Sequence, residues 1–121
     1  MSRLAAIDAL LPLKAVELEL LLALVDEERH GYGLVQQIAE RTNGLVQLEP
    51  GNLYRIIKRL LAEGLVQESA RRNTPDSDDE RRRYYRLTAF GARVLAADLQ
   101  RLRTLLASGP ARTLIRRFRT A

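Results

Sequence analysis

Apolar residues recur every three or four positions in three successive stretches of the chain, the spacing that places side chains on one face of an α-helix. The pattern predicts helices over residues 14–28, 32–41 and 50–63. The first is apolar around most of its circumference, so we expect it to be buried on more than one side. Gly31, Asn43-Gly44 and Gly64 stand where these helices should end or turn.

The predicted helix over residues 50–63 has two faces of opposite character. Its apolar arc is formed by Leu53, Ile56, Ile57, Leu60 and Leu61. At about 100° per residue, the opposite arc carries Asn52, Arg55, Lys58 and Arg59, with Tyr54 at the boundary. A basic outer face is typical of a helix that lies in the major groove of DNA. An ordinary solvated face is the alternative interpretation.

Two predicted strands, residues 65–72 and 81–88, follow this helix and are joined by a polar turn. Alternation predicts that Tyr85 and Leu87 point inward, which leaves Tyr84 and Arg86 on the other face. Both arms are rich in arginine: Arg71, Arg72, Arg81, Arg82 and Arg83. A helix followed by a cationic hairpin is the layout of a winged helix-turn-helix, whose hairpin can lie along DNA phosphates.

The tip of this hairpin, residues 76–80, is acidic. Phosphates would repel such a tip, so we expect the arms to contact DNA more than the tip does. The run lacks the glycine and the distal glutamate of an EF-hand loop, which favours a solvated turn over a calcium site.

A last helix is predicted from Thr88, a good N-cap, to about Ala107. It carries a heptad seam that includes Leu95, Leu99, Leu102 and Leu106. Because three helices already supply a core, we expect this seam to form a dimer interface; packing on its own domain is the alternative. After Gly109-Pro110 the tail is either a short amphipathic helix or a disordered basic arm.

The expected fold class is therefore mainly α with a small β-hairpin, a winged helix-turn-helix plus a C-terminal dimerisation helix. Residues 1–88 would form the DNA-binding domain, with a helical extension at 1–13. Residues 89–108 would form the dimerisation helix and residues 109–121 a basic tail.

Charge and composition narrow the function. The 121 residues, 46% of them apolar, suffice for one compact domain. Residues 1–48 hold 4 basic against 7 acidic residues, whereas residues 49–121 hold 16 against 8. A basic C-terminal part with a net charge of +5 overall favours a polyanionic partner.

The sequence lacks the residues that several functional classes of protein require. Without cysteine there is no disulfide or thiolate metal site, and we expect no metal and no cofactor. No set of nucleophile, base and acid is present, so we expect no enzyme. The sole histidine, His30, is expected to cap a helix or face solvent. The N-terminus does not read as a signal peptide, and no apolar run approaches the ~18 residues of a membrane span, so we expect no membrane partner.

The order and spacing of several short segments resemble the PadR family of bacterial transcriptional regulators over about residues 17–108. The segments are Gly31-Tyr32-Gly33, Gly51-Asn52-Leu53-Tyr54, Arg59-Leu60, Gly64-Leu65-Val66 and residues 83–88 with Gly91. The family usually has Thr at the position of Asn52 and Pro at that of Arg55. The short C-terminal helix is similar to the smaller subfamily, which has a single dimerisation helix.

The resemblance implies a cytoplasmic homodimer, working on the bacterial nucleoid, that binds a palindromic operator in double-stranded DNA and commonly represses transcription. Members of the family often respond to a small aromatic or cationic effector held near the dimer interface. Such an effector is a hypothesis for this chain.

These features lead to an assignment of contacts. Asn52 and Arg55, with Lys58 as a further candidate, would reach base edges. Phosphate contacts are assigned to Tyr32, Tyr54, Arg59 and the hairpin arginines. Tyr54 could instead be a core residue with its hydroxyl at the rim. The competing hypothesis for the whole chain is a dimeric winged-helix module that binds protein or RNA without operator specificity.

Overall fold

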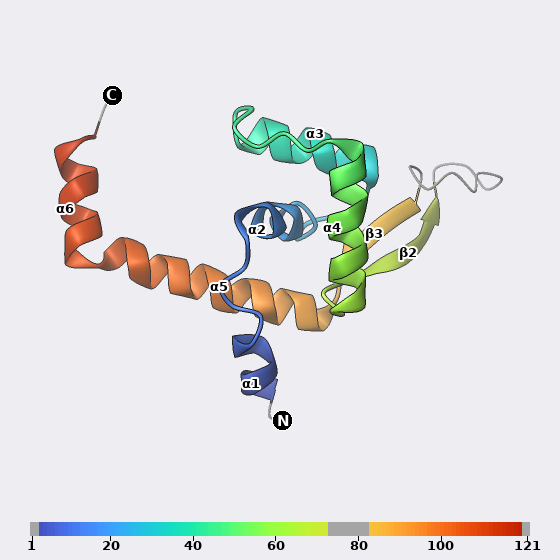
Figure 1. Ribbon diagram of the computed structural model, residues 1–121, viewed down its shortest axis with the longest axis horizontal. Helices are drawn as coiled ribbons and strands as arrows, with labels where there is room; N and C mark the ends of the chain where they lie inside the picture. The colour runs from blue at the N-terminus through green and yellow to red at the C-terminus, as the bar shows by residue number, and fades with distance from the viewer. Residues whose placement is uncertain (1–2, 73–82, 120–121) are drawn as a thin grey trace.

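The computed structural model describes residues 3–72 and 83–119, and the fold is mainly helical, with a small antiparallel sheet (Figure 1). The elements in chain order are α1 (Arg3–Asp8), α2 (Ala15–Leu22), β1 (Arg29–His30), α3 (Gly31–Arg41), α4 (Pro50–Ala62), β2 (Val66–Arg72), β3 (Arg83–Leu87), α5 (Ala89–Ala107) and α6 (Gly109–Arg117). The long α5 runs beneath α2, α3 and α4 and extends well past them (Figure 1). The predicted fold class, mainly α with a small β-hairpin in a winged helix-turn-helix, is confirmed.

The core lies where α2, α3 and α4 pack over the first half of α5. Its fully buried side chains include Leu20, Leu21, Leu34, Ile38, Leu53, Leu60, Leu65 and Val94. Each such side chain contributes about 1.5–3 kcal/mol by leaving water. This packing fixes the relative positions of the helices that carry the basic surface.

The predicted helix over residues 14–28 is too long, because α2 ends at Leu22. Ala23 and Leu24 lie in the turn after the helix but are also buried. The apolar run in the sequence is therefore longer than the helix. Arg29 stabilises this turn by donating from Nε to the carbonyl oxygen of Ala23 at 2.6 Å. The chain then enters β1, which the sequence pattern did not predict.

The sheet contains one strand more than the predicted hairpin. Within the described residues its strand order is β1-β3-β2, with both pairs antiparallel. In β1, His30 lies opposite Tyr84 of β3 in the strand register, and their rings meet edge to face at 5.2 Å. Tyr84 thus lies on the face opposite to Tyr85, as the alternation predicts, and outside the main core cluster. It is nevertheless only 6% exposed, because His30 of β1 packs against it, and the sequence did not reveal this burial.

Most other helix boundaries agree with the predictions. The second and third predicted helices correspond to α3 and α4, and α5 spans the predicted last helix. His30 caps α3 as expected of a capping histidine, since its Nδ1 accepts from the amide of Gly33 at 3.0 Å. The tail is helical: Ser108 caps α6, which ends at Arg117.

The junction between the α4–β2 turn and α5 is very closely packed. The Thr88 hydroxyl accepts from the Gly91 amide at 2.8 Å and donates to the Gly64 carbonyl at 2.6 Å. A Cβ at Gly91 would clash with the carbonyl oxygen of Leu65 and lie 2.8 Å from its carbon. Only glycine allows α5 to start so close to this turn.

Gly91→Ala is therefore expected to lower the free energy of unfolding by about 2–4 kcal/mol, because the backbone at Leu65 must move to admit a methyl group. Urea unfolding followed by circular dichroism measures the change. Gly51→Ala is the matched control, since a Cβ there meets nothing within 4 Å and α4 should gain up to about 1 kcal/mol. Similar losses in both variants would contradict this account of the junction.

Candidate nucleic-acid interface

The outward face of α4 carries the polar residues that the sequence pattern placed there. Arg55 and Lys58 are exposed, and Asn52 is half-buried. Arg55 donates from Nη2 to the Asn52 side-chain oxygen at 2.5 Å, so these two groups are held together in the free protein. A guanidinium beside an amide presents donors and an acceptor of the kind that read base edges.

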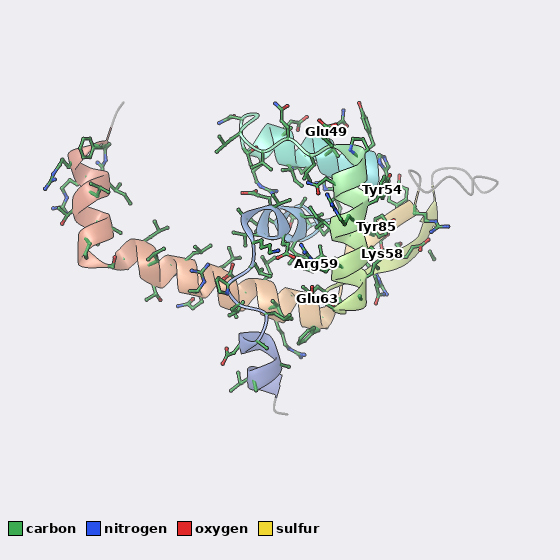
Figure 2. The ribbon with its side chains drawn as sticks, viewed as in Figure 1. Glu49, Tyr54, Lys58, Arg59, Glu63 and Tyr85 are labelled. Carbon is green, nitrogen blue, oxygen red and sulfur yellow. The ribbon has the colours of Figure 1, made fainter. Side chains whose placement is uncertain are left out.

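Lys58 and Arg55 also face an open groove between α4 and the sheet. The groove has a volume of about 530 Å³ and is lined by Tyr54, Arg55, Ile57, Lys58, Leu61, Glu68, Arg83 and Tyr85. Figure 2 shows Tyr54, Lys58 and Tyr85 gathered in this region of the molecule. The basic side chains of α4 and the base of the hairpin thus belong to one continuous surface.

One acidic residue belongs to the same groove. Glu68 on β2 lies 3.7 Å from the Nε of Arg83 on β3. This pairing spans the two arms of the hairpin, so Arg83 has a role inside the sheet as well as a place in the groove.

Tyr54 is half-buried where α3 and α4 meet. A Cβ at Gly31 would lie 2.6 Å from the Tyr54 hydroxyl, so a glycine at the start of α3 is needed for this close approach. Tyr54 therefore packs within the helix-turn-helix and also lines the groove beside α4. Tyr32, the next residue of α3, is 63% exposed.

Arg59 has a structural role that the sequence did not reveal. Its Nη2 lies 2.7 Å from Oε2 of Glu17 on α2. The other carboxylate oxygen of Glu17 accepts from the backbone amide of Lys14 at 3.1 Å. Glu17 is 8% exposed whereas the side chain of Arg59 is 44% exposed, so this pair anchors α4 to the start of α2 at the edge of the core. Arg59 leaves α4 on the side of α2, away from the groove beside the sheet (Figure 2).

A second ion pair braces the same set of helices. Arg41 at the end of α3 pairs with Glu19 of α2 at 2.8 Å and also donates to its carbonyl oxygen at 2.6 Å. No local pattern links either arginine to its partner on α2, because each contact exists only once the helices have packed.

Several predicted site residues are only partly described. Arg81 and Arg82 lie outside the described residues. Arg71 and Arg72 belong to β2, and their side chains are not described.

The four leucines of the predicted dimerisation seam have different environments. Leu95 is 3% exposed and belongs to the core of its own domain, and Leu102 is half-buried. Leu99 and Leu106 are 39% and 57% exposed. Only the second half of α5 therefore presents large apolar side chains outward.

Other kinds of site find little support in residues 3–72 and 83–119. No group of three or more potential metal ligands occurs there. No helix within these ranges has the length and apolar character needed to cross a membrane.

Comparison with known proteins relates these features to a family. Residues 20–97 match the model of the transcriptional regulator PadR-like family. An uncharacterized protein of Lysinibacillus sphaericus is 30% identical over 73 residues, which is 60% of this chain and 64% of that protein. The chain thus spans somewhat less than two thirds of the length of this curated relative.

Solved structures of similar fold include regulators of this family. A PadR family regulator of Clostridium difficile has a TM-score of 0.65 at 23% identity, over 87% of this chain and 98% of that one. RosR of H. salinarum has a TM-score of 0.64 at 25% identity, over 88% and 90%. Bacillus subtilis PadR, solved in complex with operator DNA, has a TM-score of 0.60 at 23% identity, over 73% and 48%.

The Glu17–Arg59 pair leads to a stability prediction. Glu17→Gln should lower the free energy of unfolding by about 1–2 kcal/mol, because it removes the charge partner of Arg59 and a carboxylate near the start of α2. Urea unfolding at neutral pH measures the effect. Glu40→Gln on the exposed side of α3 is the control and should change stability by less than about 0.5 kcal/mol. Equal effects would show that the pair does not hold α4.

Proposed function

Because the chain belongs to the PadR-like family, whose members are transcriptional regulators and not enzymes, we propose that it represses transcription as a homodimer on a palindromic DNA operator. The observation that carries the proposal is the polar arc of α4: Arg55 and Lys58 are exposed and line the groove beside the hairpin, and the half-buried Asn52 contacts Arg55. An α-helix fits the major groove, where each base pair presents a distinct pattern of donors and acceptors.

Base contacts are assigned to the first two turns of α4. Arginine can donate two hydrogen bonds to guanine, and asparagine can pair with adenine. Arg55 and Asn52 already contact each other at 2.5 Å, which reduces the side-chain freedom lost on binding. Lys58, one turn further on, is the third candidate for a base edge.

Phosphate contacts are assigned to residues around this helix. Tyr32 is exposed at the start of α3, and Tyr54 lines the groove on the sheet side of α4. The hairpin arginines Arg71, Arg72, Arg81, Arg82 and Arg83 supply positive charge along the arms. Arg59 keeps 44% of its side chain exposed despite its ion pair with Glu17, so a phosphate contact by its remaining donors stays part of the proposal.

Dimerisation is assigned to α5. Leu99 and Leu106 are exposed on the second half of α5. Two α4 helices held by such an interface would read half-sites about one helical turn apart, roughly 34 Å. A small aromatic or cationic effector near this interface, and a place of action on the nucleoid in the cytoplasm, follow from the family and remain part of the proposal.

Selection of bound duplexes from a random pool, followed by sequencing, tests this function. The expected result is an inverted repeat whose affinity falls steeply with salt, because each phosphate contact releases a counterion. Selection without any preferred duplex, or preference for single-stranded RNA or an acidic protein, would support the competing interaction module instead.

Substitutions on α4 and on the hairpin should behave differently. Arg55→Ala is expected to weaken binding by about 1–3 kcal/mol and to relax specificity at one base position. Arg82→Ala should weaken all sequences alike and reduce the salt slope by about one unit. Fluorescence anisotropy over a salt series, with single-base variants of the selected site, separates these outcomes. Arg93→Ala, exposed on α5, is the control. Equal, sequence-independent losses for Arg55 and Arg82 would contradict the assigned roles.

A further inference from the structure

The last helix, α6, is amphipathic and its apolar side is uncovered. Leu114, Ile115 and Phe118 are 55%, 51% and 69% exposed. At about 100° per residue they share one side of the helix, Arg112 and Arg117 flank that side, and Arg116 lies on the opposite side. The helix stands at the far end of α5, away from the body of the domain (Figure 1). A helix of this composition is stable when its apolar side packs against another surface.

An open groove lies at the opposite end of α5. It has a volume of about 370 Å³, and its lining comes from the turn after α2, the end of β3 and the first residues of α5: Leu24, Val25, Asp26, Glu27, Glu28, Arg86, Leu87, Thr88, Ala89 and Ala92. Val25 is 54% exposed. The groove thus combines an apolar lining with a run of three carboxylates.

The charged residues that line this groove differ in whether they have a partner within the protein. Glu27 pairs with Arg29 at 3.0 Å, and Glu28 accepts from the Ser69 hydroxyl at 2.7 Å. Asp26 is exposed and makes no hydrogen bond or ion pair within the described part of the chain. The guanidinium of Arg86, the one cation in the lining, lies against the side chain of Gln67 on β2. The groove therefore complements a helix with an apolar side flanked by arginines, which is the composition of α6.

One chain cannot bring these two features together. The groove adjoins the first turn of α5 and α6 follows its last turn, and the 19 residues between them span about 28 Å of straight helix. The α6 that fits this groove must come from a second copy of the chain.

The exposed stripe of α5 gives the arrangement of the two copies. Its first half presents small residues, Ala89, Ala92 and Ala96, and its second half presents Leu99 and Leu106 with Arg103 between them. When two such helices run antiparallel, the large side chains of each lie on the small ones of the other, as a two-fold interface requires. With Leu99 at the axis, Leu106 faces Ala92 of the partner subunit.

In this register Gly109, where α6 starts, comes opposite Ala89 of the partner subunit, beside the groove. We propose that in the homodimer the α6 helix of each subunit docks into the groove between the α2–β1 turn and the start of α5 of the other subunit. Its apolar side covers Val25, and the flanking Arg112 and Arg117 lie toward the carboxylates Asp26 and Glu27. This inference rests on the homodimer of the proposed function. It adds a second contact between the subunits to the contact between the two α5 helices.

Such docking has a consequence for DNA recognition. The turn after α2 is continuous with β1, which pairs with β3 of the hairpin. An α6 held there links the hairpin of one subunit to the dimerisation helix of the other. The distance between the two α4 helices is then set by two contacts on each side of the axis instead of by α5 alone.

Cross-linking tests the contact directly, since the chain has no cysteine of its own. A Val25→Cys chain is mixed with an Ile115→Cys chain and treated with a short bis-maleimide. Docking predicts a covalent heterodimer formed at least about fivefold more than with Thr113→Cys, on the opposite side of α6, because only one side of α6 approaches Val25. Equal yields for the two cysteines would overturn the proposal.

Leu99→Cys separates this inference from the dimer itself. A Leu99→Cys chain that cross-links to its own copy, without the Val25–Ile115 product, means that the dimer exists and the docking of α6 is wrong. Sedimentation of the unmodified chain as a monomer at tens of micromolar would overturn the homodimer and the docking together.

A charge-reversal cycle tests the electrostatic part. Asp26→Arg alone, and Arg112→Glu with Arg117→Glu, should each raise the dimer dissociation constant about tenfold, and combining all three should restore part of the loss, because opposite charges again face each other. If the α6 reversals weaken DNA binding and leave the dimer dissociation constant unchanged, α6 contacts DNA and the proposal fails.

Discussion

The burial of one face of α4 determines what its opposite face presents. Leu53, Ile57 and Leu60 are 2% exposed or less, and each carries a free energy of burial that no exposed charge on the same helix can match. Rotating α4 about its axis would bring these side chains into water and take Arg55 and Lys58 out of it. The orientation of the proposed DNA-reading face therefore follows from hydrophobic packing. The positions of its polar residues are a consequence of the burial of the opposite face.

Ion pairs refine this orientation at the edge of the core. Arg59 reaches Glu17 at 2.7 Å, and Arg41 reaches Glu19 at 2.8 Å, so both helices of the helix-turn-helix are tied to α2. From the sequence alone, each arginine was expected to lie on the charged surface. In the structure, each uses part of its hydrogen-bonding capacity in a contact within the protein. The basic residues of this chain therefore have two different roles: some form ion pairs between helices, and others are exposed to solvent. Only the partners seen in the structure distinguish the two roles.

The two halves of α5 also differ in burial, and packing is again the reason. Its first half belongs to the domain core through Val94 and Leu95, and Gly91 allows it to start against the backbone of Leu65. Its second half carries exposed leucines and leads into α6 (Figure 1). One regular heptad pattern therefore contributes to the core of the domain in its first half and, in the proposed homodimer, to the interface between subunits in its second half. The exposed apolar side chains of α5 and α6 support the proposed homodimer.

The sequence by itself determined the three helices of the domain, the hairpin after them, the N-cap at Thr88, the polar arc of α4 and the family, because helix periodicity and capping are local properties of neighbouring residues. It did not determine the end of α2, the pairing of β1 with β3, the burial of Tyr84 or the ion pair of Arg59. Each of these depends on segments far apart in the chain: β1 pairs with β3 only after the hairpin forms, and Glu17 meets Arg59 only after α2 and α4 pack. Whether a heptad leucine such as Leu95 faces its own core or solvent was likewise decided by tertiary structure, since the repeat is the same in either case.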